Sequence, residues 1–521
     1  MREQERPRRG ILLPLIFLFL VYEISNSIIV VTVIGIWYFG LIMLEENGVL
    51  DKWDATRVLG IILMLRTRQG QKILDKVSSN RKFWRIYGEF SIWICLFVMT
   101  GVILLLLLSF GSSVTSPPRE PIPAQDLLLI PGVTSFVPFW WPVLALIVAI
   151  IIHEYSHGIQ ARAHGMKIRS FGLLLVGPLP MGAFAEPEQE EMYRAPRRDR
   201  MRLFAAGPSI NLIATYIVII LLSSTANGFV AKNPGVHAVE IIEDTGAEKS
   251  GLLPYEIITH MNGIPVPDYE IFSEEMDGFQ PGDEITLTVL SGSWSAADFN
   301  QKTEQSQRDI GVTLMDRHDW YIGLCEQDDS CNLEETRNYL EEVGVGPDSN
   351  IPFLGVSGLS DGEAGVSRYG SILNAVNDDN ILGAVIITAI MPLLMLGVPI
   401  AGDGQVMNLR EQAMLTAGDG VIASIIGTSG LIMLFTFLFW LAWINFLLGF
   451  ANLIPMIPFD GGHIVKDGVH SSLSFYNEIF NRGIHPIKIE SWANKISNNS
   501  SFISVSYTHL RAHETRGNLV C

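Results

Sequence analysis

The chain has 521 residues, of which 48% are hydrophobic and 17% are charged, and its mean hydropathy is positive. This composition argues against a purely soluble globular protein. The net charge is −18, and it is uneven: residues 224–380 carry 29 acidic side chains against 7 basic ones. We therefore expect one acidic soluble domain attached to a mildly basic membrane protein, and no nucleic-acid partner.

Several long apolar runs predict a polytopic α-helical membrane protein embedded in a lipid bilayer, because about 20 apolar residues span the hydrocarbon layer. The first run, residues 11–44, is interrupted at 23–27 and forms either one long helix or a tight hairpin. It lacks a convincing signal-peptide cleavage site, so we expect it to remain as an anchor. The later runs are 90–110, 139–152, 203–222, 381–400 and 431–450.

Basic residues predict how these helices are oriented. Seven Lys and Arg lie between residues 66 and 85, and five Arg lie between 194 and 202. By the positive-inside rule both loops are expected in the cytoplasm. The helix from residue 139 then runs from outside to inside, and the acidic domain lies outside.

The third run ends in His153, Glu154, Tyr155, Ser156 and His157, which is the HExxH pattern. Residues four apart share one face of a helix, so both imidazoles can bind one metal ion. The carboxylate between them is placed to take a proton from water. Ionisable groups are costly inside a membrane and mark function by default. We predict a zinc site here, with Glu154 as the general base.

The segment 170–185 follows the metal motif and contains two short apolar runs around Gly177, Pro178 and Pro180. This pattern predicts a small hairpin beside the metal helix. Its exposed edge is suited to hold an extended peptide substrate by strand addition. The alternative is a plain connecting loop.

The acidic region contains the segment Gly246–Leu252, a hairpin turn signal at Asn262–Gly263, and apolar residues that alternate from 285 to 289. With these features, about residues 229–314 resemble a PDZ domain. The resemblance implies a module that captures peptide termini and filters substrates. The alternative is a domain that only spaces the membrane segments.

After the PDZ-like segment, residues 321–323 and 353–356 resemble two short strands. Cys325 and Cys331 lie in the same external region, where they form either a small bridged loop or two free thiols.

The run ending near residue 450 is followed by a second polar motif. A catalytic zinc site needs a third protein ligand and an open position, and Asp460 is the best candidate for the ligand. Pro455 and Pro458 break the helix before it, and Gly461 after it permits a sharp turn. The alternative is an ordinary helix exit with a solvated aspartate.

HExxH in one membrane segment and NxxPxxxxDG in a later one together resemble the site-2 protease family of intramembrane zinc metalloproteases. Asn452, Pro455, Asp460 and Gly461 match the second motif. A GPxxN motif in between, formed by Gly207, Pro208 and Asn211, also matches. The resemblance covers about residues 83–463.

The resemblance implies Zn²⁺ held by His153, His157 and Asp460, with Glu154 as the catalytic base. Asn452 and Pro455 are candidates for positioning the substrate, although a structural amide is an equal interpretation of Asn452. The implied activity is that of a metalloendopeptidase acting on membrane-spanning proteins, in regulated intramembrane proteolysis. The alternative is a catalytically inactive membrane scaffold that binds proteins through its PDZ-like domain.

The expected architecture is therefore a membrane-embedded helical protease with an inserted extracytoplasmic α+β, β-rich PDZ-like domain. Its parts are an N-terminal membrane anchor region (1–65), the first part of the protease core (66–222), the acidic region (223–380), the second part of the core (381–470), a tail (471–504) and a segment interpreted as non-native sequence (505–521). A full crossing by 381–400 would place Asp460 on the wrong side of the bilayer. We therefore expect that run to be re-entrant, to lie at the external surface, or to pair with a second weak crossing.

Overall fold

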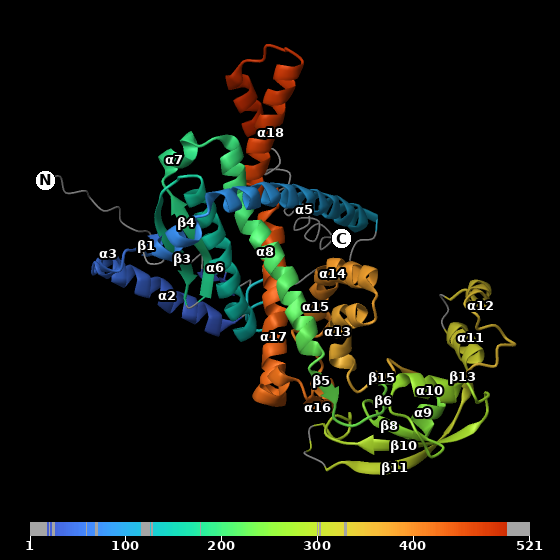
Figure 1. Cartoon of the computed structure of the whole chain (residues 1–521). Helices are drawn as coiled ribbons and strands as arrows, with labels where there is room; N and C mark the ends of the chain where they lie inside the picture. The colour runs from blue at the N-terminus through green and yellow to red at the C-terminus, as the bar shows by residue number, and fades with distance from the viewer. Residues whose placement is uncertain are drawn as a thin grey trace, which may run out of the picture. The chain divides into compact units, whose positions relative to one another are not determined.

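The computed structural model in Figure 1 describes residues 18–19, 21–22, 27–58, 60–67, 71–115, 126, 129–177, 179–299, 301, 304–327 and 331–496. The segment interpreted as non-native, 505–521, lies outside the described residues, as does the end of the expected tail. The chain divides into two compact units. The first comprises the described parts of Met1–Ile219, Ile390–Gly404 and Phe437–Cys521, and the second comprises Ile220–Ala389 and Gln405–Thr436.

Among the described residues, five helices are long and apolar enough to cross a membrane, which confirms a multi-pass membrane protein. A sixth predicted run instead forms α14 (Ile381–Leu396), whose 16 residues rise only about 24 Å and contain Pro392. That is shorter than the roughly 30 Å hydrocarbon layer. The five helices are α2 (Ile28–Glu46), α5 (Arg81–Thr115), α6 (Trp140–Ala163), α8 (Arg197–Ala226) and α17 (Val421–Asn452).

The first apolar region is a hairpin and not one long helix. The side chain of Leu18 lies 3.8 Å from the position that a Cβ atom on Gly35 would take. One continuous helix would separate these residues by about 25 Å. Leu18 therefore packs back against α2, and the hairpin alternative is confirmed.

The first unit contains a four-stranded antiparallel sheet in the order β1-β2-β3-β4. The predicted hairpin is confirmed as its last two strands, and β4 is the edge strand that contacts α6. The first two strands come from the expected anchor region, and the boundary expected after residue 65 falls inside β2. The strands are β1 (Ala55–Val58), β2 (Ile62–Thr67), β3 (Ile168–Val176) and β4 (Leu179–Pro187).

The arginines that predict cytoplasmic loops also bind α8 to its neighbours. Arg198 and Arg202 pair with Glu89 on α5. Arg200 donates to the buried Asp467 carboxylate on α18 (Asp460–Ile479) at 2.5 Å. The pair of Arg200 and Asp467 is largely buried, so it fixes α8 against α18, because removing either partner would leave an uncompensated charge. The remaining elements of the first unit are α3 (Val49–Lys52), α4 (Gln71–Val77), α7 (Gln189–Arg194) and α15 (Val398–Ala401).

The second unit is built on an antiparallel sheet in the order β11-β10-β8-β6-β15, with β9 paired to β8. Its core packs apolar side chains of the sheet against α9 and α10. The sheet's strands are β6 (Val236–His237), β8 (Ile257–Met261), β9 (Ile264–Pro265), β10 (Glu284–Ser291), β11 (Ser306–Thr313) and β15 (Ser360–Asp361). The helices over it are α9 (Gly246–Lys249) and α10 (Tyr269–Met276).

Smaller elements complete this unit. Three two-stranded ladders pair β5 (Phe229–Ala231) with β16 (Leu415–Ala417), β7 (Glu240–Ile241) with β14 (Val356–Ser357), and β12 (Met315–Asp316) with β13 (Pro352–Phe353). Strands after residue 314 thus pair with strands of the PDZ-like segment. The other helices are α11 (Arg317–Gln327), α12 (Leu333–Glu342), α13 (Ala364–Asn377) and α16 (Leu409–Met414).

Three local predictions in this unit are tested by the structure. The turn at Asn262–Gly263 is confirmed: both residues have positive φ, and they join the paired strands β8 and β9. The bridge is also confirmed, because Cys325 and Cys331 form a disulfide. The strand predicted at 321–323 is wrong. These residues lie in α11, where Ile322 packs into a small apolar cluster with Leu340 of α12.

The buried His237 predicts that acid destabilises the second unit. It is 0% exposed, it stacks on Tyr255, and neither ring nitrogen has a hydrogen-bond partner among the described residues. Burial lowers the pKa of His237 from 6.5 to about 4. His237 therefore binds a proton more tightly in the unfolded chain than in the folded one. Its contribution to the free energy of unfolding is complete above about pH 6.5 and is lost as the pH falls toward 4.

We expect acidification from pH 7 to pH 5 to cost this unit about 2 kcal/mol through His237 alone. Hydrogen exchange of the β6 and β8 amides, corrected for intrinsic rates, measures this loss in the whole protein. His237→Phe keeps an aromatic ring against Tyr255 and should remove the excess acid sensitivity. Equal acid sensitivity in both proteins would contradict the assignment.

Candidate active site

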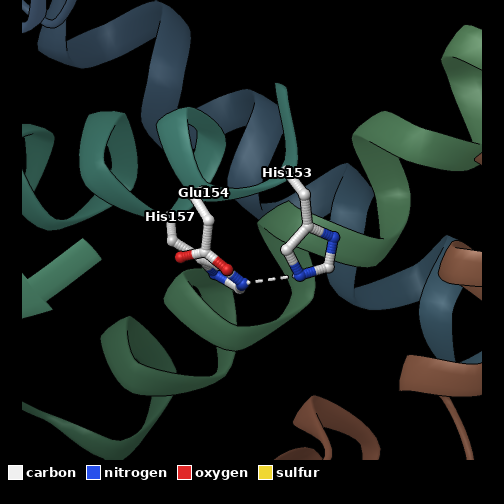
Figure 2. A group of neighbouring side chains, drawn as sticks. All are labelled: His153, Glu154 and His157. Atoms are coloured by element: carbon white, nitrogen blue, oxygen red, sulfur yellow. Dashed lines mark hydrogen bonds between the residues drawn. The ribbon is translucent and has the colours of Figure 1, made fainter. Parts of the chain in front are cut away.

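The two histidines and the glutamate of the HExxH motif project from one region of α6. Figure 2 shows the His153 and His157 rings side by side, with their Nε2 atoms 3.1 Å apart. Both side chains are largely buried, at 6% and 12% exposure. The apolar residues before the motif make this stretch helical, and the four-residue spacing turns both rings the same way.

Asp460 joins the two histidines from a segment about 300 residues later. Its Oδ2 atom lies 3.3 Å from the Nε2 atom of His153 and 3.3 Å from that of His157. Asp460 is the first residue of α18, directly after the turn that follows α17. Side chains on Gly461 or Gly462 would come within 2.6 Å of that turn's backbone, so only glycine permits this tight reversal.

The spacing of these three atoms fits a single zinc ion. Tetrahedral coordination with metal–ligand distances of about 2.0 Å separates neighbouring ligand atoms by about 3.3 Å. The observed separations are 3.1, 3.3 and 3.3 Å. Two imidazoles and a carboxylate are also a common ligand set of catalytic zinc sites, which leave the fourth position open.

The opposite ring nitrogens are fixed by α8. The Nδ1 atom of His153 lies 3.1 Å from the Asn211 side-chain oxygen, and that of His157 lies 2.7 Å from the Leu203 carbonyl oxygen. The amide nitrogen of Asn211 in turn donates to the Ala149 carbonyl oxygen at 3.3 Å. Partners of this kind set the tautomer and orientation of metal-binding histidines, here with Nε2 turned toward Asp460.

Gly207 lets α8 approach these rings. A Cβ atom at this position would lie 2.3 Å from the Nε2 atom of His157 and 2.6 Å from that of His153. One face of α8 carries Leu203, Gly207 and Asn211, which are spaced four residues apart. The oxygen atoms of the first and the last contact the histidine Nδ1 atoms, and the glycine between them leaves space for the rings. The GPxxN motif therefore shapes the space that a metal ion needs.

Glu154 lies between the histidines and the sheet. Its Oε2 atom accepts a hydrogen bond from the Ala185 backbone amide of β4 at 2.7 Å. This bond ties the carboxylate to the edge strand and fixes its direction. Two contributors were missed by sequence reasoning, namely the Ala185 amide and the Leu203 carbonyl, because backbone groups carry no signal in residue type.

The other two predicted residues come from the end of α17 and from the turn after it. Asn452 donates to the Leu448 carbonyl oxygen within α17 at 2.9 Å, and Pro455 lies in the turn before α18. A second group of potential ligands, Asp316, His318 and Asp319, is explained by helix capping. The Asp316 carboxylate accepts the backbone N–H groups of the other two residues at the start of α11.

Comparison with known proteins shows the family to which the chain belongs. The model of peptidase family M50 matches residues 141–478, almost two thirds of the chain. The chain belongs to this family. An uncharacterized protein of Methanocaldococcus jannaschii is 29% identical over 267 residues, which is 51% of this chain and 68% of that protein.

Two further relatives of this M50 protein carry an enzyme name. The zinc metalloprotease Rip1 of Mycolicibacterium smegmatis is 25% identical over 356 residues, covering 62% of this chain and 82% of its own. Rip1 of Mycobacterium tuberculosis is 24% identical over 369 residues, covering 65% and 85%. The predictions of the site-2 protease family, of a zinc metalloprotease and of Zn²⁺ as cofactor are thus confirmed.

Gly207→Ala tests the close approach of α8. We expect the added methyl group to displace the imidazoles and to lower the zinc affinity by at least about tenfold, while the helix itself is retained because alanine favours helices. Zinc content after dialysis against a graded chelator series measures this. Gly101→Ala in α5 is the matched control, since a Cβ atom there would meet no atom within 4 Å. Equal zinc retention in both variants would contradict the proposed constraint.

Proposed function

We propose that this M50 protein cuts membrane-spanning protein substrates within the bilayer, near its cytoplasmic face. The observation that carries the proposal is the convergence of His153, His157 and Asp460 beside a helix that is long and apolar enough to span a membrane. Peptide-bond hydrolysis within the bilayer requires that water and the ionisable side chains be enclosed by the protein and shielded from lipid. Regulated intramembrane proteolysis is the process that this arrangement suits.

In the proposed mechanism, His153, His157 and Asp460 would hold the zinc ion, and Glu154 acts as the general base. A zinc ion held there would supply Lewis acidity, which would polarise the scissile carbonyl group and make water more acidic. Glu154 takes the water proton and later passes it to the leaving amine. The Ala185 amide keeps the carboxylate directed toward the reacting atoms.

The substrate is proposed to bind as an extra strand beside β4. A helical segment must unwind before its peptide bonds become accessible, and an extended chain then needs hydrogen-bond partners. β4 pairs with β3 on one side and is the edge of its sheet. Because the Ala185 amide of this strand contacts Glu154, a chain lying along β4 would pass beside the base.

The proposed path of the chain back to the site is supported by a contact within the first unit. The Gly404 backbone packs on Phe136 and Pro138, where a Cβ atom would lie 3.2 Å from the proline ring. That is the start of α6, about 20 Å along the helix from His153. The chain after α14 and α15 therefore lies at the proposed external end of α6, and α17 can return from there toward Asp460. This arrangement supports the expectation that residues 381–400 do not cross the bilayer fully.

The second unit is proposed to act as an extracytoplasmic PDZ-like filter that binds peptide termini. Its Cys325–Cys331 disulfide is in keeping with an oxidising compartment. An inactive scaffold would require none of the polar contacts among His153, His157 and Asp460, which are expensive inside a membrane. The enzyme is therefore the function we propose.

Glu154→Gln tests the proposed chemistry. The purified protein in lipid vesicles should cut a single-pass model substrate, and the variant should lose about 10² to 10⁴ in rate. Zinc content should stay near that of the wild type, since Glu154 is not a proposed ligand. Glu190→Gln, on an exposed side chain of α7, is the matched control and should cut normally.

The position of the cut separates the proposal from its alternatives. Mass spectrometry of the products should locate the cleaved bond inside the membrane segment, toward its cytoplasmic end. Full activity of Glu154→Gln, or cleavage confined to the soluble part of the substrate, would contradict the proposal.

A further inference from the structure

A cavity of about 420 Å³ lies between the sheet of the first unit and α6, and Glu154 forms part of its wall. Its volume is within the range of about 300–1,000 Å³ that is typical of ligand sites. Trp53, from the segment before β1, and Leu65 of β2 also line it. Both residues lie outside the matched M50 segment, so this chain adds walls of its own beside the proposed base.

The register of the sheet determines which side chains face this cavity. Directly paired residues lie on one face of a sheet, and the next pair lies on the opposite face. Leu65 of β2 pairs with Leu173 of β3, and both line the cavity. The next pair, Arg66 with Gly172, lies on the opposite face, where the Arg66 guanidinium group donates to the Thr56 hydroxyl at 3.2 Å. The positive charge is thus turned away, and the sheet presents apolar side chains to the cavity.

Helices cover both ends of this sheet face and leave its middle open. At one end, Leu63 packs into a buried cluster with Leu41 of α2. At the other end, Phe171 stacks on Tyr155 of α6, with ring centroids 5.0 Å apart. Between these ends, three apolar side chains of the cavity wall remain 39–55% exposed, namely Leu173, Ile151 and Trp53. A gap with such walls favours an apolar occupant, because binding covers apolar surface on both partners.

Glu154 connects the cavity to the proposed reaction. Its Oε2 atom accepts the hydrogen bond from the Ala185 amide of β4, and the same residue lines the cavity. Ala185 pairs with Phe171, so these two side chains lie on the sheet face that borders the cavity. A substrate strand added beside β4 would turn every second side chain toward that face. A substrate residue close to the cut can therefore direct its side chain toward the cavity.

We propose that this cavity is an apolar subsite that binds a large aliphatic or aromatic side chain of the substrate, next to the scissile bond. The inference rests on the proposed proteolytic function and deepens it, because it names the class of residue that the enzyme selects. The Glu154 carboxylate in the wall disfavours an acidic side chain at this position, since like charges repel.

Side-chain exchange in the substrate tests the subsite. A single-pass substrate carries Ala, Asn, Leu or Phe at each of the three positions on either side of the mapped cut, and the full chain cleaves it in lipid vesicles. At one position the wild type should prefer Leu and Phe over Ala by at least about tenfold in kcat/KM. Asn is close to Leu in size but polar, so it should be as poor as Ala. This comparison separates apolar character from size.

Leu173→Trp fills the cavity, and Leu174→Trp is its matched control. Leu174 is the next residue of β3 and pairs with Met64, so it lies on the opposite face of the sheet. The ratio of kcat/KM for the Leu and Ala substrates should fall toward one in Leu173→Trp and stay at the wild-type value in Leu174→Trp. Zinc content should equal that of the wild type in both variants, since neither residue is a proposed ligand.

Leu173→Ala makes the opposite change at the same position. The enlarged cavity should raise the ratio of kcat/KM for the Phe and Leu substrates above the wild-type value. This variant keeps the test decisive if the larger tryptophan disturbs the fold, which a loss of zinc from Leu173→Trp would reveal.

Other outcomes overturn the subsite while leaving the protease intact. Equal cleavage of all substrates by the wild type would show that the cavity selects no side chain. A preference for Leu and Phe that is unchanged in both Leu173 variants would place its origin elsewhere. An effect of these variants that is equal for all substrates and varies with the acyl-chain length of the vesicle lipids would assign the cavity to a lipid chain. No cleavage of any substrate by the wild type would instead refute the proposed function itself, and the subsite with it.

Discussion

The approach of the α8 backbone to α6 at Gly207 determines where the other parts of the site lie. Leu203, Gly207 and Asn211 form one face of α8, and each meets the histidine rings in a different way. Leu203 and Asn211 contact the Nδ1 atoms of the histidines. Gly207, which has no side chain, leaves the Nε2 atoms accessible. Any larger residue at Gly207 would occupy the space between His153, His157 and Asp460.

Charged contacts at the ends of the helices support this arrangement. Arg200 of α8 binds Asp467, which lies two turns after Asp460 on α18. The carboxylate at the site is thus carried by a helix whose position is fixed by a largely buried ion pair. Such pairs add little net stability, but they oppose sliding of α18, because a displaced Asp467 would lose its partner. The same arginines supply the basic charge that indicates a cytoplasmic loop.

The sequence reveals those parts of the molecule that depend on local pattern. The metal motif, the apolar helices, the β3–β4 hairpin and the turn at Asn262–Gly263 all follow from spacing or from residue type. Asp460 can be predicted from the sequence because a zinc site needs a third ligand and the second motif supplies an aspartate. Its 3.3 Å distance from each histidine could be known only from the structure.

The remaining parts depend on contacts that local sequence does not encode. β2 pairs with β3 across about 110 residues, so nothing near Leu65 predicts that it lines a cavity with Glu154. The segment 321–323 has strand-like composition, yet packing against α12 makes it helical. The Ala185 amide and the Leu203 carbonyl are backbone groups, whose roles arise from the fold and not from their side chains.

The central claim is that one zinc ion is held by His153, His157 and Asp460, which the fold brings together from two distant segments. X-ray absorption at the zinc edge of Asp460→Cys tests this most directly, because sulfur and light atoms scatter differently. The account predicts two imidazoles in both proteins and one new zinc–sulfur distance of about 2.3 Å in the variant. Zinc bound in the variant without a sulfur neighbour would contradict it.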